Sequence, residues 1–176
     1  MHLILDLDNT LLYAEIKSNK LSKLLFRPCL REFLRYCFDT FESVNIWTAG
    51  TRYYFDAVYP ELLKYLPENK SFGLIYTSER CTYKTKEYMG TCTHRYVIKK
   101  IRKMIKKISG ATVHNTLIID DNHMTAIKNY GNFVQIAPYH GNDTDMELIY
   151  LIHKLKSICK HYRTHLTVRN MEKRFI

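Results

Sequence analysis

Short runs of consecutive apolar residues alternate along this chain with longer stretches in which apolar positions recur every three or four residues. The apolar runs predict buried strands over residues 2–7, 44–47, 72–76, 116–119 and 133–136. The three-to-four-residue repeat predicts helices over residues 28–39, 52–63, 96–108, 124–129 and about 147–159. Strands that alternate with helices indicate an α/β fold, a three-layer sandwich with a mainly parallel central sheet.

Local signals refine two of these helices. Pro28 suits the first turn of its helix, because proline lacks the backbone N–H that a first turn leaves unpaired. Thr144 and Glu147 have the spacing of a capping box and predict the start of the last helix, which we expect to end near Cys159. The pattern therefore predicts one domain over residues 1–160 and a basic C-terminal extension over residues 161–176.

Composition narrows the class of protein. A chain of 176 residues suits one domain, and no apolar run approaches the roughly 20 residues that span a bilayer. The five cysteines are scattered and odd in number, which argues against a disulfide framework and favours an intracellular location, nuclear or cytoplasmic. A net charge of +10 favours anionic partners, nucleic acid among them, and we expect no membrane association.

Polar side chains follow three of the predicted strands. Asp6 and Asp8 come at the end of the first, Thr48 follows the second, and Asp120 and Asp121 follow a later one. Ligands bind beyond the carboxyl ends of the strands in such sheets, so we expect these five residues to meet at one edge. Clustered carboxylates suit a hard cation, and Mg²⁺ fits best because it also bridges to phosphate.

This constellation can carry phosphoryl chemistry. Asp6 could act as a nucleophile, since carboxylates form aspartyl-phosphate intermediates. Asp8, two residues further on, could protonate the leaving oxygen and then activate a water molecule. A lysine would balance the negative charge on the phosphate oxygens in the transition state.

Several segments in order resemble the haloacid dehalogenase superfamily of phosphatases, in particular the small phosphatases of the RNA polymerase II carboxy-terminal domain. The matching segments are "DLDNTLL", "FRPCLREFL", "IWTAGTRYYFDAVYPEL", "SERCTYKT", "IIDDN" and "NDTDMELIYLIHKL". Together they cover roughly residues 1–157. The resemblance implies a Mg²⁺-dependent phosphatase that acts on phosphoserine or phosphothreonine. Enzymes of this superfamily usually carry a cap domain, but too few residues separate Thr10 from the segment 26–28 to form one there. We therefore expect an open site without a large cap domain, which suits a phosphorylated protein segment as substrate.

The resemblance also implies roles for individual residues. Asp6 matches the nucleophile, Asp8 the general acid and base, and Thr48 a hydroxyl that helps to hold the phosphate. The family's lysine precedes apolar residues two and five positions further on, which favours Lys99 over Lys100.

The resemblance places Mg²⁺ on the Asp6 side chain, the Asp8 backbone carbonyl and Asp121, where small members of the family often carry asparagine. Asp120 would lie beside this site and orient a water molecule or the lysine, so it belongs to the candidate metal set as well.

Other interpretations stay open. Residues 8–10 could form a simple turn, and residues 120–122 could cap a helix. The charge of +10 would also suit a phosphatase of nucleic-acid ends, and an inactive phosphate-binding scaffold is a third possibility. The intact set of carboxylates argues against the scaffold.

Overall fold

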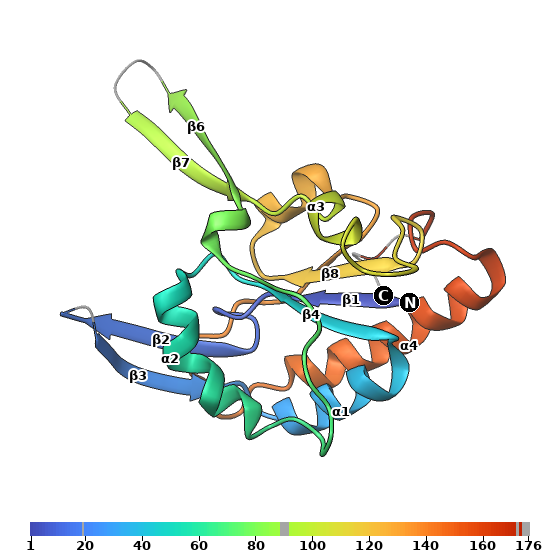
Figure 1. Cartoon of the computed structure of the whole chain (residues 1–176), viewed down its shortest axis with the longest axis horizontal. Helices are drawn as coiled ribbons and strands as arrows, with labels where there is room; N and C mark the ends of the chain where they lie inside the picture. The colour runs from blue at the N-terminus through green and yellow to red at the C-terminus, as the bar shows by residue number, and fades with distance from the viewer. Residues whose placement is uncertain (19, 89–91, 172, 174–176) are drawn as a thin grey trace.

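A five-stranded parallel sheet forms the centre of the molecule (Figure 1). The computed structural model describes residues 1–18, 20–88, 92–171 and 173. In the order β5-β4-β1-β8-β9, the strands cover Ile75–Tyr76, Ser43–Trp47, His2–Leu5, Thr116–Asp120 and Phe133–Gln135. The predicted α/β fold with a mainly parallel sheet is therefore confirmed.

Helices cover both faces of this sheet (Figure 1). Three α-helices pack on one face, namely α1 (Leu30–Thr40), α2 (Arg52–Leu63) and α4 (Glu147–His165). The short α3 (Arg102–Ile105) and the 3₁₀ helix η2 (His123–Lys128) lie on the other. Successive strand residues point to opposite faces, so Leu3 and Leu5 join the larger core while Ile4 joins the smaller one.

The prediction of a helix over residues 96–108 is wrong. Residues Cys92–Ile98 form strand β7, which pairs antiparallel with β6 (Thr82–Tyr88), and only Arg102–Ile105 is α-helical. The helical repeat is real from Ile101 onward, since Ile101 and Met104 are buried. Before Ile101, the hydrogen bonds between β7 and β6 favour a strand more than the apolar repeat favours a helix. The repeat within one segment does not show that a partner strand is present.

Two hairpins extend from the sheet and were not predicted. Strands β2 (Leu12–Lys17) and β3 (Lys20–Phe26) form one, and β6 with β7 forms the other, preceded by the 3₁₀ helix η1 (Ser78–Arg80). Figure 1 shows both hairpins projecting past the sheet on the same side of the molecule. Each is a two-stranded ribbon rather than a cap domain.

Helix α4 differs from its prediction at both ends. The residue before its first turn is Met146, and its side chain makes no capping bond, so the capping box of Thr144 is wrong. The N–H of Glu147 instead donates to Asp145 Oδ1. The helix continues to His165, beyond the predicted end at Cys159 and across the predicted boundary at residue 160. Within the described residues, no helix is long and apolar enough to cross a membrane.

A buried arginine ties the start of α4 to the turn after β1. Arg27 is 1% exposed, and its guanidinium donates twice to the Asp145 carboxylate, both bonds at 2.8 Å. A third bond, of 3.1 Å, runs from Arg27 Nη1 to the carbonyl of Thr10. Arg27 thereby fixes the polypeptide that follows Asp6 and Asp8.

Replacement of Asp145 by asparagine should destabilise the fold at neutral pH by about 3 kcal/mol, because Arg27 would stay buried without its counter-charge. Burial raises the pKa of Asp145, but hydrogen bonds from Arg27 and the Glu147 N–H outweigh it and hold that pKa below its usual value. The pair therefore stabilises the fold above the ordinary carboxyl pKa, and this contribution is lost as the pH falls through the lowered value.

Urea unfolding at neutral and acidic pH measures this effect. The difference between wild type and Asp145→Asn should shrink on acidification, whereas Asp143→Asn, at an exposed neighbouring position, should change stability little at either pH. Equal stability of wild type and Asp145→Asn at neutral pH would show that the ion pair contributes nothing.

Candidate active site

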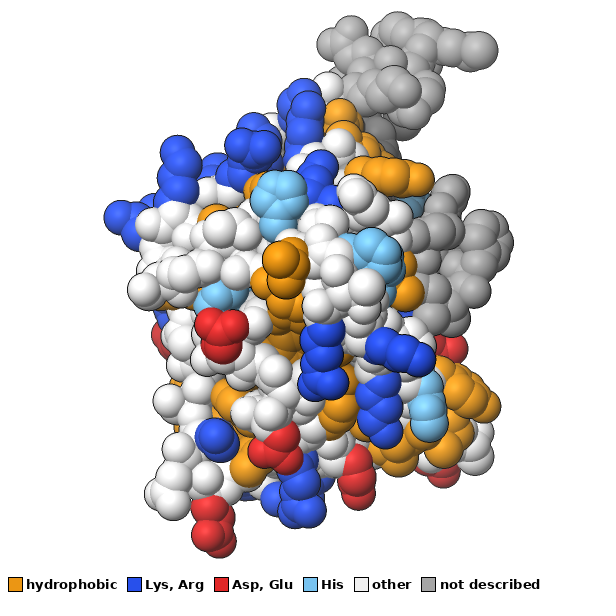
Figure 2. Space-filling model, turned by 90° about the vertical axis from the view of Figure 1, so that its right-hand side faces the viewer, with side chains coloured by type: hydrophobic (Ala, Val, Ile, Leu, Met, Phe, Trp, Pro, Cys, Tyr) orange, Lys and Arg blue, Asp and Glu red, His pale blue; other side chains and the backbone are white. Residues whose placement is uncertain are grey.

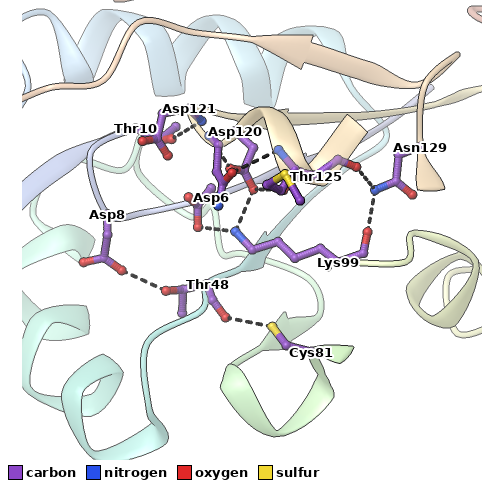
Figure 3. A network of polar contacts seen from close by, with 12 residues as sticks. Asp6, Asp8, Thr10, Thr48, Cys81, Lys99, Asp120, Asp121, Thr125 and Asn129 are labelled. Atoms are coloured by element: carbon purple, nitrogen blue, oxygen red, sulfur yellow. Dashed lines mark hydrogen bonds and ion pairs between the residues drawn. The ribbon is translucent and has the colours of Figure 1, made fainter. Parts of the chain in front are cut away.

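The ends of β1, β4 and β8 bring together the polar residues that follow them (Figure 3). Asp6 is 5% exposed, Asp120 is 1% exposed and Thr48 is fully buried. Parallel strands end at one edge of the sheet, which explains how side chains so far apart in sequence come to meet. Asp121 is partly buried beside them, and its N–H donates to Thr10 Oγ1 over 3.2 Å.

A buried lysine lies between two of these carboxylates. Lys99 Nζ is 2.5 Å from Asp6 Oδ1 and donates to Asp120 Oδ2 over 2.7 Å. Burial disfavours the ammonium, but the charges of Asp120 and Asp6 outweigh it and raise the pKa of Lys99, so this side chain stays protonated. Lys100 is only half-buried and lines a different hollow. Lys99 lies on the connection between β7 and α3, not on the helix from which it was predicted.

The carboxylates outnumber the cation at this edge. Burial and the charge of Asp120 raise the pKa of Asp6 well above its usual value, and Lys99 only partly opposes them. Burial and the charge of Asp120 also raise the pKa of Asp121. With one lysine beside them, these buried acids are therefore costly to ionise together, and a bound divalent cation would offset that cost.

The donor set fits such a cation. Asp6, Asp120 and Asp121 can each offer one carboxylate oxygen, and these atoms lie within 4.8 Å of one another. Oxygen donors at this spacing suit Mg²⁺. The Asp120 carboxylate already accepts bonds from Lys99, the Thr125 hydroxyl and the Asn122 N–H, so Asp6 and Asp121 have more free acceptor capacity.

The carboxylate of Asp8 points away from this group, toward β4 and α2 (Figure 3). Thr48 Oγ1 donates to Asp8 Oδ2 over 2.9 Å, and the Tyr54 hydroxyl donates to Asp8 Oδ1. The hydroxyl of Thr48, which the resemblance assigns to phosphate, thus bonds Asp8 in this structure. A Cβ at Gly50 would lie 2.5 Å from the Tyr54 ring, so a glycine there leaves room for this arrangement.

Sequence reasoning missed Tyr54 as a partner of Asp8. Burial and the charge of Asp8 raise the pKa of Tyr54, so its hydroxyl remains a donor at neutral pH. One signal could have found it, because Tyr54 lies in the first turn of a helix that begins at the same sheet edge as Thr48.

Sequence reasoning also missed a buried amide that holds the lysine segment. Asn129 is 1% exposed, and its Nδ2 donates to the carbonyls of Lys99 and Thr125 while its Oδ1 accepts the Ile101 N–H. The Thr125 hydroxyl in turn donates to Asp120 Oδ2, the same oxygen that Lys99 Nζ reaches. Figure 3 shows these contacts around Lys99. The bonds of Asn129 and Thr125 therefore fix the backbone of Lys99 relative to Asp120, whose carboxylate the Lys99 side chain contacts.

The residues that follow β1 form a hydrogen-bonded turn. Asn9 has a φ of 56°, in the left-handed region that asparagine tolerates, and Thr10 N–H and Leu11 N–H both donate to the carbonyl of Leu7. Residues 8–10 are therefore a turn, and this turn also places Asp8 beside Thr48.

Comparison with known proteins finds a matching family and solved structures with a similar fold. The profile of the NLI interacting factor-like phosphatases matches residues 1–165. No curated protein sequence matches the chain. The chain resembles a structure of Fcp1, described as an essential RNA polymerase II CTD phosphatase, with a TM-score of 0.64 and 18% identity.

Two further structures show the same fold. One is the fission yeast Fcp1 in a variant form bound to beryllium fluoride, with a TM-score of 0.63 and 16% identity. In both Fcp1 comparisons the match covers 92% of this chain and 63% of the other. The other is an uncharacterized protein from Listeria monocytogenes serotype 4b, with a TM-score of 0.57 and 12% identity over 91% of this chain and 98% of that one.

Proposed function

This chain belongs to the NLI interacting factor-like phosphatase family, and on that premise we propose that it hydrolyses phosphomonoesters through an aspartyl-phosphate on Asp6. The observation that carries this proposal is the buried contact of Lys99 Nζ with Asp6 and Asp120. Asp8 and Asp121 line the same pocket, which has a volume of about 390 Å³. A nucleophile, an acid and a fixed positive charge in one pocket are what phosphoryl transfer needs.

Each step can be assigned to a side chain of this pocket. A carboxylate oxygen of Asp6 attacks phosphorus, and the bond from phosphorus to the ester oxygen breaks. Asp8 gives its proton to the departing oxygen and then accepts a proton from the water molecule that hydrolyses the acyl phosphate. Lys99 holds a positive charge beside Asp6 as negative charge develops on the phosphoryl oxygens.

Mg²⁺, held by Asp6, Asp121 and the Asp8 backbone carbonyl, would neutralise negative charge on the phosphate when bound. Asp120 serves mainly to orient Lys99, because three donors already occupy its carboxylate. Tyr54 and Thr48 orient the carboxylate of Asp8.

The substrate we propose is phosphoserine or phosphothreonine in a protein segment, such as the carboxy-terminal domain of RNA polymerase II. An apolar groove of about 510 Å³ adjoins the site, and its lining includes Ile16, Tyr53 and Tyr54. Tyr54 connects the two, since it lines the groove and bonds Asp8. Ile16 and Tyr53 are 56% and 76% exposed, so an apolar side chain near the phosphorylated residue could pack on them.

We also propose an intracellular location, nuclear if the polymerase is the substrate. Cys29, Cys37, Cys81 and Cys159 are free thiols, which suits a reducing compartment.

A panel of substrates tests the proposed function. We expect Mg²⁺-dependent turnover of phosphoserine and phosphothreonine peptides to exceed that of 3′- and 5′-phosphorylated oligonucleotides. The reverse order would identify a nucleic-acid end phosphatase. Turnover of none of these, nor of a small aryl phosphate, would leave the inactive scaffold as the better interpretation.

Asp8→Asn should reduce turnover of esters with poor leaving groups by about a hundredfold or more, because asparagine cannot supply the proton. The rate of the first chemical step should fall less with aryl phosphates, because their leaving groups depart without protonation. Single-turnover rates across a series of leaving groups measure this. Equal losses across the series would contradict the acid role of Asp8.

Asn129→Ala should reduce turnover by about tenfold or more, because the segment that carries Lys99 would lose its fixed position. Asn132 provides a matched control. It is also buried, and its Nδ2 donates to the carbonyls of Val113 and Thr116, but it does not contact the site. Thermal unfolding should show both alanine variants destabilised, while only Asn129→Ala loses turnover per folded molecule. Equal turnover of the two folded variants would rule out a positioning role for Asn129.

A further inference from the structure

Cationic side chains surround a small hollow where α3 meets η2. The hollow has a volume of about 280 Å³. It is lined by Lys100, Ile101, Arg102, Lys103, Lys106 and Lys128. Figure 2 shows Lys and Arg side chains gathered in the upper part of one face, at the height of α3 in Figure 1. We call this hollow the basic pocket.

None of the described residues that line the basic pocket is acidic. In the part of the chain that the structure describes, its cations form no ion pair with a carboxylate. Lys103 Nζ donates to the Arg80 carbonyl and to Thr82 Oγ1, both neutral groups. Like charges around one concave surface repel one another and focus positive potential into it, so an anion bound there would relieve the repulsion.

We propose that the basic pocket binds a compact polyanion carrying two or more phosphate groups, such as an inositol polyphosphate or a short polyphosphate chain. Cations that converge on so small a volume suit a ligand with its charges close together. The guanidinium of Arg102 can meet a phosphate with two parallel N–H donors, and the lysines supply point charges around it. Single-stranded nucleic acid fits less well, because its sites use aromatic side chains as stacking platforms and the described lining of this pocket contains none.

The basic pocket is distinct from the active site, although the two are adjacent. Among the residues whose positions the structure gives, none lines both pockets. Lys99 and Lys100 are consecutive but line different pockets, and η2 contributes Thr125 to one and Lys128 to the other. A bound polyanion would therefore leave Asp6 and Lys99 free for a substrate phosphate.

Isothermal titration of the full chain with inorganic tripolyphosphate and with inositol hexakisphosphate, at physiological ionic strength, tests this inference. We expect saturable binding of at least one of them, weakened about tenfold or more in the double variant Arg102→Gln/Lys106→Gln. Both residues are exposed, so the fold should survive. The double variant Lys70→Gln/Lys160→Gln removes the same charge from exposed positions elsewhere and should bind like wild type.

Equal weakening in both double variants would show attraction by net charge alone and overturn the proposal. So would an absence of saturable binding, or tighter binding of a single-stranded oligonucleotide that also depends on Arg102 and Lys106. Sedimentation with vesicles that contain a phosphoinositide separates two sources of the ligand. Co-sedimentation that is lost in Arg102→Gln/Lys106→Gln supports a lipid headgroup as the ligand. Binding of the soluble polyanion without co-sedimentation supports a free polyanion as the ligand.

Discussion

Asp6→Asn should abolish turnover of every phosphomonoester while the fold remains intact. Asparagine is nearly isosteric with aspartate but is a far poorer nucleophile, so no acyl phosphate forms. The change removes one negative charge from a buried group of carboxylates, so the unfolding temperature without metal should be unchanged or higher.

Turnover of an aryl phosphate and thermal unfolding, measured on the same preparation, separate chemistry from stability. Asp56→Asn is the control, because Asp56 is 61% exposed on α2 and should keep wild-type turnover. Wild-type turnover by Asp6→Asn would show that Asp6 is not the nucleophile. A loss of turnover accompanied by unfolding would assign Asp6 a structural role instead.

Lys99→Ala should reduce turnover by roughly a hundredfold or more, the scale of losing one preorganised contact in the transition state. The expectation rests on the contacts of Lys99 Nζ with Asp6 and Asp120. Alanine leaves these two carboxylates without their cation, so the unfolding temperature of the variant must be measured as well. Lys99→Met, which keeps most of the buried volume, should lose turnover to a similar degree.

Other lysines of the same segment serve as controls. Lys103→Ala and Lys107→Ala, at exposed positions, should change turnover of a small phosphate ester little. Lys100→Ala should also stay active, since Lys100 lines the basic pocket. A crippled Lys100→Ala beside an active Lys99→Ala would contradict the assignment.

The strands of the sheet could be predicted because each is a short apolar run. His2–Leu5 and Thr116–Asp120 are buried along their whole length, as the sequence of β1 and β8 implies. The β2–β3 and β6–β7 hairpins could not be predicted, because each strand depends on a partner strand that the pattern within one segment does not reveal. For the same reason, the segment that forms strand β7 was predicted to be part of a helix.

The meeting of the carboxylates at one edge could be predicted because each lies at the end of a strand or within three residues after it. Lys99 could be chosen only through the family resemblance, by the apolar residues two and five positions after it, Ile101 and Met104, which are buried. The helix on which Lys99 was expected to lie is absent, since strand β7 ends at Ile98 and α3 begins at Arg102. Tyr54, Thr125 and Asn129 were not predicted as site residues. Their roles depend on which backbone carbonyl or carboxylate lies next to them after folding, and single-sequence spacing does not encode that.

The role of Asp6 as nucleophile is tested most directly by identifying the residue that carries the phosphoryl group during turnover. Wild-type protein would be mixed with Mg²⁺ and substrate, quenched, reduced with borohydride and analysed by peptide mass spectrometry. Borohydride converts an aspartyl phosphate to homoserine, so we expect homoserine at position 6 only when substrate and Mg²⁺ are both present. Homoserine at the position of another aspartate, or phosphate release without any modified residue, would show that Asp6 does not carry the phosphoryl group.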